Sequence, residues 1–177
     1  MSLFVKNIFR FIIFILMQVY ILCQIPPLHQ FITPYLYFLF ILWLPFSISR
    51  LGLLVVAFSL GITLDYFLGT PGLHTAPCVL IAYLRPFLIN ILISQEGAEL
   101  NYAEPSIKSM GFAPYGLYIL VFTFIHHFYL VLIEWLSFGN FIYFLGKVTA
   151  TTGVSLLLIF ITEMMFFRKQ KFRTNTA

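Results

Sequence analysis

Charged residues are scarce in this chain: Asp, Glu, Lys and Arg make up 9% of its 177 residues, whereas 61% are hydrophobic. Soluble domains carry about 25% charged residues, and less than about half of their residues are apolar. The mean hydropathy of +0.98 points the same way. The sequence therefore predicts an integral membrane protein. We expect one polytopic domain over residues 1–177, with no soluble domain beside it.

Cysteine is also rare, and Cys23 and Cys78 lie in or beside apolar runs without CxxC spacing. We expect two small packing residues rather than a disulfide framework. The chain has no P-loop, nucleophile elbow, zinc-protease motif, or haem or flavin signature. His126 and His127 point about 100° apart on a helix, which does not suit one metal ion. We therefore expect no enzyme activity, no cofactor and no metal.

The net charge of +4 is not a nucleic-acid signal, because most of the positive charge lies at the two ends of the chain. Charge clusters beside apolar spans report topology, and anionic lipid head groups are sufficient partners for them. We expect membrane lipid as a partner and no nucleic acid. The terminal basic residues are Lys6, Arg10, Arg168, Lys169, Lys171 and Arg173.

Apolar runs of roughly 20 residues are long enough to cross a membrane as helices. Such runs predict an all-α bundle of about six transmembrane helices. A five-span count stays open, because residues 47–50 alone divide the second run from the third. Six spans would put the basic residues on one side, which predicts that both termini lie in the cytoplasm. The runs cover residues 8–25, 31–48, 51–68, 73–93, 114–136 and 141–167.

Aromatic residues make up 19% of the chain. Trp and Tyr gather where a membrane helix meets the head groups. Those near the predicted span ends are therefore expected to form an interfacial belt, namely Tyr35, Tyr37, Trp43, Trp135 and Tyr143.

The third and fourth spans are predicted to form a hairpin. Asp65 lies near the end of one span, His74 lies at the start of the next, and residues 69–72 (Gly-Thr-Pro-Gly) form the turn. The proline fixes its own φ, and the two glycines allow conformations closed to other residues. We expect Asp65 to pair with His74 or to accept hydrogen bonds from the first N–H groups of the fourth span. The functional alternative is a docking or substrate site on the non-cytoplasmic side.

Arg85 lies inside the fourth span, about two turns from its cytoplasmic end. Two interpretations stay open: an arginine that snorkels to the interface beside a kink at Pro86, and an inward-facing functional arginine. Glu134 and Lys147, at facing ends of the fifth and sixth spans, are expected to pair, and Glu163 is expected to meet the basic tail or head-group water. The polar stretch 94–111 is expected to be a solvated connector or a cytoplasmic docking surface; it carries Glu96, Glu99, Glu104 and Lys108.

The hairpin resembles that of the bacterial rod-shape-determining membrane protein family MreD. Members share a Gly…Asp…Gly-x-His/Arg pattern leading into an Ala-Tyr-Leu segment, small size, six spans and basic cytoplasmic ends. The specific likeness covers residues 61–85, and the rest of the chain matches in hydropathy. It rests on Gly61, Asp65, then Gly69-Thr70-Pro71-Gly72-Leu73-His74 and Ile81-Ala82-Tyr83-Leu84-Arg85.

The resemblance implies a non-enzymatic component of the cell-elongation machinery in the bacterial inner (cytoplasmic) membrane. Such a component binds MreC and helps to organise lateral peptidoglycan synthesis and cell shape, with the MreB filament, the RodA glycosyltransferase and its partner transpeptidase as further partners. Residues expected to shape its interaction or structural hairpin are Gly61, Asp65, Gly69, Pro71, Gly72, His74 and Arg85.

Two alternatives remain open. The MreD family is similar in fold to the substrate-binding membrane subunits of energy-coupling-factor vitamin transporters, so a small-molecule or lipid pocket between the helices is conceivable. From the residues themselves, an intramembrane enzyme acting on lipid could use Asp65 and His74 as acid and base. The enzyme hypothesis requires that both side chains line a cavity open to substrate.

Overall fold

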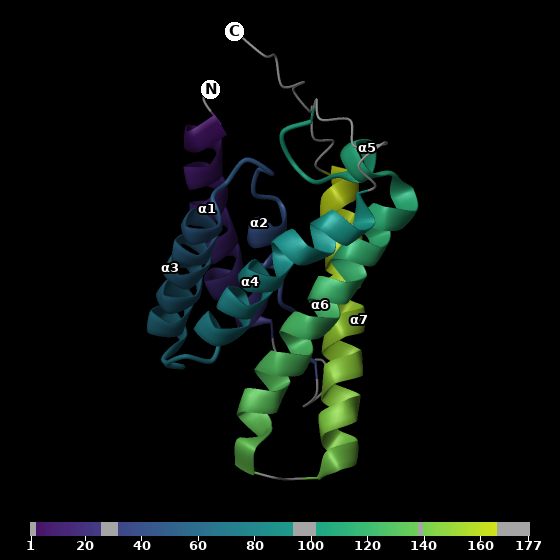
Figure 1. Cartoon of the computed structure of the whole chain (residues 1–177). Coiled ribbons are helices and arrows are strands. Elements are labelled where there is room, and N and C mark those ends of the chain that lie inside the picture. The colour runs from purple at the N-terminus through teal and green to yellow at the C-terminus, as the bar shows by residue number, and fades with distance from the viewer. Residues whose placement is uncertain (1–2, 26–31, 94–101, 138–139, 166–177) are drawn as a thin grey trace, which may run out of the picture.

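The structure is a computed structural model that describes residues 3–25, 32–93, 102–137 and 140–165 (Figure 1). Five of its helices are long and apolar enough to cross a membrane, the first of them continuing from α1 through η1. This confirms an all-α membrane bundle. The elements are α1 (Leu3–Tyr20), η1 (Leu22–Gln24), α2 (Leu39–Leu42), α3 (Arg50–Leu68), α4 (Thr75–Leu92), α5 (Ile107–Met110), α6 (Phe112–Glu134), η2 (Trp135–Ser137) and α7 (Phe141–Met165).

The long helices pack in chain order. Helices α3 and α4 form an antiparallel hairpin, α4 packs on α6, α6 packs on α7, and α1 lies against α3. The start of α1, the end of α7 and the short α5 lie at the same end of the molecule, the top of Figure 1. At the opposite end, the α6–α7 hairpin extends beyond the turn between α3 and α4.

The expected second span, residues 31–48, is not a continuous helix. Within its described part the chain forms a single α-helical turn, α2, and residues 35–44 are all buried. We call residues 35–44 the central segment. Pro34 and Pro45 flank it, and proline offers no backbone N–H to a helix. Backbone outside regular helices is tolerated at membrane depth only where protein or water covers it. Here the bundle itself covers it.

The start of the central segment, at Tyr35 and Leu36, is held by side chains from α1 and α7. The Gln18 side chain accepts a hydrogen bond from the Leu36 N–H (2.9 Å) and donates one to the Pro34 carbonyl (3.1 Å). The Ser155 hydroxyl accepts from the Tyr35 N–H (3.2 Å). Because an unsatisfied backbone group costs several kcal/mol in hydrocarbon, these polar residues stabilise the irregular backbone.

Side chains from α4 and α6 hold the other end of the central segment, at Leu42 and Leu44, in the same way. The Tyr118 hydroxyl donates to the Leu42 carbonyl at 3.0 Å, and the Arg85 guanidinium donates to the Leu44 carbonyl. Arg85 also donates through Nε to the Tyr118 hydroxyl at 2.9 Å. Two helices thereby satisfy carbonyls that α2 is too short to use.

The interfacial-belt expectation is wrong for Tyr35, Tyr37 and Trp43, which are 5%, 0% and 4% exposed. They belong to the central segment, so they form the core rather than its rim. The Trp43 Nε1–H donates to Glu163 at 2.8 Å, and the Tyr115 hydroxyl donates to the same carboxylate. Glu163 therefore has partners inside the bundle. The basic tail that it was expected to meet lies outside the described residues.

The expectation of a solvated connector over residues 94–111 fails at Glu104, which is 5% exposed. Its Oε1 atom lies 3.2 Å from Lys6 Nζ and 2.9 Å from Arg10 Nη1, so it ties this connection to the start of α1. The two positive charges of α1 supply the partners that solvent was expected to supply. Three expectations lie outside the described residues: those for Glu96, for Glu99 and for the basic cluster from Arg168.

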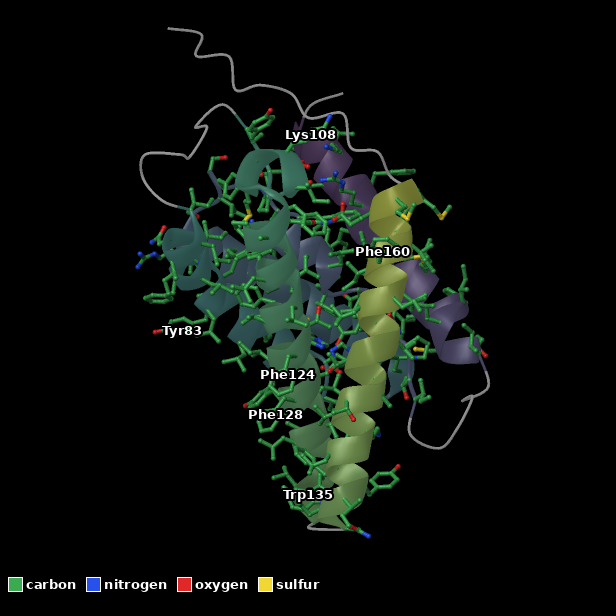
Figure 2. All side chains as sticks on the ribbon, turned by 90° about the vertical axis from the view of Figure 1, so that its right-hand side faces the viewer. Tyr83, Lys108, Phe124, Phe128, Trp135 and Phe160 are labelled. Carbon is green, nitrogen blue, oxygen red and sulfur yellow. The ribbon has the colours of Figure 1, made fainter. Side chains whose placement is uncertain are left out.

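The outer faces of the long helices are apolar, as lipid contact requires. Phe124 and Phe128 on α6, Tyr83 on α4 and Phe160 on α7 are 39–63% exposed (Figure 2). In water such large side chains would form an aggregation-prone surface. In a bilayer they face hydrocarbon, which agrees with the membrane class.

Candidate functional site

The turn between α3 and α4 has the backbone that its sequence predicts. Helix α3 ends at Gly69 in the left-handed conformation (φ 67°), and Gly69 N–H donates to the Asp65 carbonyl. Gly72 also has positive φ, at 83°. L-residues other than glycine rarely adopt this conformation, so the two glycines allow a short reversal.

The Asp65 carboxylate is the centre of this turn and is 4% exposed. Its Oδ1 accepts from the Thr70 hydroxyl (3.2 Å), the His74 N–H (2.9 Å) and His74 Nδ1 (2.9 Å). Its Oδ2 accepts from the Gly72 N–H (3.0 Å), the Thr75 N–H (3.0 Å) and the Thr75 hydroxyl (2.5 Å). The carboxylate therefore caps the start of α4 and binds His74, so both arrangements expected from the sequence are present together.

Gly61 lets the two helices approach closely enough for these bonds. It lies one turn before Asp65, on the same face of α3. A Cβ atom built on Gly61 would stand 2.4 Å from Thr75 Cα and 2.9 Å from Thr75 N. No side chain fits there, so glycine at position 61 sets the separation at which Asp65 reaches the first residue of α4.

His74 is buried (3% exposed), and burial lowers its pKa, with the hydrogen bond and charge of Asp65 opposing that shift. A neutral ring donates through Nδ1 to Asp65. The ring packs edge-on against Tyr35 and Tyr37, at 5.8 and 5.6 Å between centroids. Its Nε2 atom is buried without a hydrogen-bond partner among the described residues.

The His74 ring is one member of a buried polar cluster that sequence reasoning did not assemble. The Tyr37 hydroxyl lies 2.9 Å from His126 Nε2. His127 donates through Nδ1 to the Thr123 carbonyl (2.6 Å) and accepts from Ser155 through Nε2 (2.9 Å). Adjacent histidines in an apolar run could have signalled this cluster. Their partners, however, lie on the central segment and on α7, far away in sequence.

The histidines do not make a metal centre in the described part of the chain, where no three His, Cys, Asp or Glu side chains are arranged to hold an ion. Cys23 and Cys78 are free thiols, and Cys78 is buried. The cluster instead joins α4, α6 and α7 to the central segment by hydrogen bonds and ring contacts.

Arg85 faces inward, at 2% exposed, and does not snorkel. No carboxylate pairs with it among the residues that the structure describes; its acceptors are Leu44 and Tyr118. Helix α4 continues through Pro86, which lies inside it. Arg85 faces inward because its guanidinium supplies the hydrogen bond that the Leu44 carbonyl needs at the end of the central segment.

We expect Arg85→Gln to lower the free energy of unfolding by about 2 kcal/mol, because a shorter side chain leaves a buried carbonyl without its donor. Thermal unfolding in mild detergent measures this loss. Arg50→Gln is the matched control, since Arg50 is exposed at the start of α3 and the same substitution there should cost under about 0.5 kcal/mol. Equal melting temperatures for the two variants would contradict this role of Arg85.

The surface beside the turn is exposed and aromatic. Tyr66 is 84% exposed and Phe67 is 50% exposed in the last turn of α3. Gly69, Pro71 and Gly72 are exposed next to them. We call Tyr66, Phe67 and residues 69–72 the hairpin tip. The buried Asp65 network thus supports an accessible surface. The sequence predicted that surface at Asp65, residues 69–72 and His74, but Asp65 and His74 are buried beneath it.

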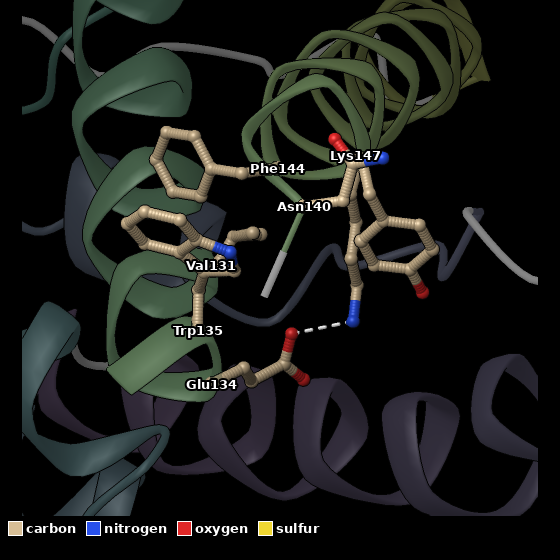
Figure 3. Close-up of a pocket in the computed structure, with 7 residues that line it drawn as sticks. Val131, Glu134, Trp135, Asn140, Phe144 and Lys147 are labelled. Carbon is tan, nitrogen blue, oxygen red and sulfur yellow. Dashed lines mark hydrogen bonds and ion pairs between the residues drawn. The ribbon is translucent and has the colours of Figure 1, made fainter. Parts of the chain in front are cut away.

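The predicted ion pair between α6 and α7 is present, with Lys147 Nζ 2.5 Å from Glu134 Oε2. It lies at the far end of the α6–α7 hairpin, beside a cavity with aromatic walls (Figure 3).

No family model, curated protein or solved structure matches this chain. The fold and the site by themselves define a class, a small all-α membrane protein in which polar side chains such as Asp65, His74 and Arg85 are buried inside the bundle.

Proposed function

We propose that this protein is a non-enzymatic component of a bacterial cell-elongation complex in the cytoplasmic membrane, where it binds MreC and helps to organise lateral wall synthesis. The observation that carries the proposal is the hairpin of α3 and α4. Its MreD-like residues Gly61, Asp65 and His74 hold α3 against the start of α4, and this arrangement presents the hairpin tip.

Burial of the Asp65–His74 pair favours a scaffold over an enzyme. General acid–base work requires that both groups reach a substrate. The two side chains are 4% and 3% exposed, and Thr70 and Thr75 occupy the remaining acceptor positions of the carboxylate. We therefore assign the pair a positioning role at the turn.

The proposed orientation places both chain ends in the cytoplasm and the hairpin tip on the opposite side. Lys6 and Arg10 at the start of α1 lie at the same end of the molecule as the end of α7. The positive-inside rule makes that end cytoplasmic. The tip then lies on the non-cytoplasmic side, where we propose that it binds MreC.

We expect Tyr66→Ala to weaken binding of MreC about tenfold while leaving the fold intact, because a highly exposed aromatic at the hairpin tip is the residue type that anchors interfaces. Copurification from membranes, followed by titration of purified MreC, measures the effect. Tyr83→Ala is the control, since Tyr83 is also exposed (58%) but lies on α4 away from the tip. Both variants should melt as the wild type does, because neither side chain is buried.

Two results would count against the scaffold proposal. Undiminished MreC binding by Tyr66→Ala would remove the tip from the interface. Recovery of ATPase and coupling subunits with a bound small molecule, in place of MreC, would favour a transporter subunit.

A further inference from the structure

A cavity of about 260 Å³ lies between the end of α6 and the start of α7 (Figure 3). One side holds the ion pair of Glu134 and Lys147. Other walls are aromatic: Tyr143 lines the cavity, and Trp135 and Phe144 are in ring contact at 5.2 Å between centroids. Because one water occupies about 30 Å³ of liquid, the space can take a small polar group of several heavy atoms.

The cavity lies at the depth of lipid head groups. Helix α7 has 25 residues. At 1.5 Å per residue it is about 37 Å long, longer than a hydrocarbon core of about 30 Å. Its ends therefore reach the polar layer. Glu134 is the last residue of α6, and Lys147 lies in the second turn of α7. The lipid-facing Phe124 and Phe128 lie deeper on α6 (Figure 2).

We propose that this cavity binds the head group of a phospholipid that carries a phosphate and a primary ammonium, as phosphatidylethanolamine does. Lys147 would donate to the phosphate, and Glu134 would accept from the ammonium. Both side chains are partly exposed, at 16% and 27%, so both charges are accessible to a lipid entering from the bilayer. This site is separate from the hairpin tip and does not depend on the proposed function.

Charge complementarity selects this head group over the common alternatives. The cavity presents one positive and one negative charge in contact. An anionic head group such as phosphatidylglycerol would bring its phosphate to Lys147 but would offer Glu134 only neutral hydroxyl donors, which make weaker bonds to a carboxylate than an ammonium does. A quaternary ammonium has no N–H to donate to the carboxylate. A head group with a phosphate and a primary ammonium can bond to Lys147 and to Glu134 at once. Charge-assisted hydrogen bonds of this kind are stronger than those between neutral groups.

The test is native mass spectrometry of the full chain released from vesicles that contain equal amounts of phosphatidylethanolamine, phosphatidylcholine and phosphatidylglycerol with matched acyl chains. We expect one retained phosphatidylethanolamine, favoured about tenfold over each competitor. Lys147→Gln and Glu134→Gln should each abolish the preference. Lys108→Gln, the same charge change at the opposite end of the molecule, should keep it (Figure 2).

Three outcomes would overturn the proposal. One is equal retention of the three lipids by the wild type, and another is an unchanged preference in both cavity variants. The third is binding of free phosphoethanolamine to the lipid-depleted protein as tightly as the lipid itself, which would make the ligand a soluble zwitterion. We expect both cavity variants to fold, because a partly exposed ion pair contributes little to stability. Circular dichroism of each variant checks this.

Discussion

Asp65→Asn is expected to lower the free energy of unfolding by about 3 kcal/mol, which is one of the two largest effects that the structure predicts. Each carboxylate oxygen accepts from three donors. In either rotamer an asparagine NH₂ group would therefore face N–H and O–H donors instead of accepting from them. Thermal unfolding in mild detergent measures the loss, and the yield of the complex with MreC should fall with it.

Thr70→Val provides the graded control for this result. It removes a single hydroxyl from the Asp65 network and should cost about 1 kcal/mol. Asp65→Asn acts through the fold, whereas Tyr66→Ala is expected to act on binding with the fold unchanged. An Asp65→Asn protein that melts at the wild-type temperature but no longer binds MreC would show that the carboxylate acts in binding and not in positioning.

Gly61→Ala is expected to destabilise the protein by about 3 kcal/mol, the upper part of the usual range for overpacking. The new methyl group would stand 2.4 Å from backbone Cα of Thr75, and backbone cannot move aside as a flexible side chain can. The hairpin would have to open, which would also lengthen the bonds from Thr75 to Asp65. Loss of melting temperature and faster proteolysis at the turn are the measurements.

Gly116→Ala in α6 is the matched control for this substitution, because a Cβ atom on Gly116 meets nothing within 4 Å. Alanine favours a helix over glycine by about 1 kcal/mol, so this variant should be as stable as the wild type or more stable. Destabilisation of both variants to the same extent would mean that the close approach at Gly61 carries no special cost.

Much of the hairpin could be predicted because its information is local. Asp65, Thr70, His74 and Thr75 lie within ten residues of one another along the chain, and the two glycines fix a turn that brings them together. Turn chemistry acts over a few residues, so spacing is enough to place a carboxylate against the next helix start. The Glu134–Lys147 pair was predictable for the same reason, since a short connection joins α6 to α7.

The sequence by itself determined the membrane class, through sparse charge and long apolar runs, and it determined the hairpin through local turn chemistry. Tertiary structure alone decided that residues 35–44 form a buried, largely irregular core and that Arg85 faces inward. The physical reason is the satisfaction of backbone groups in a medium without water. The donors and acceptors that make this segment possible, on Gln18, Arg85, Tyr118 and Ser155, are far apart in the sequence and meet only when the helices pack.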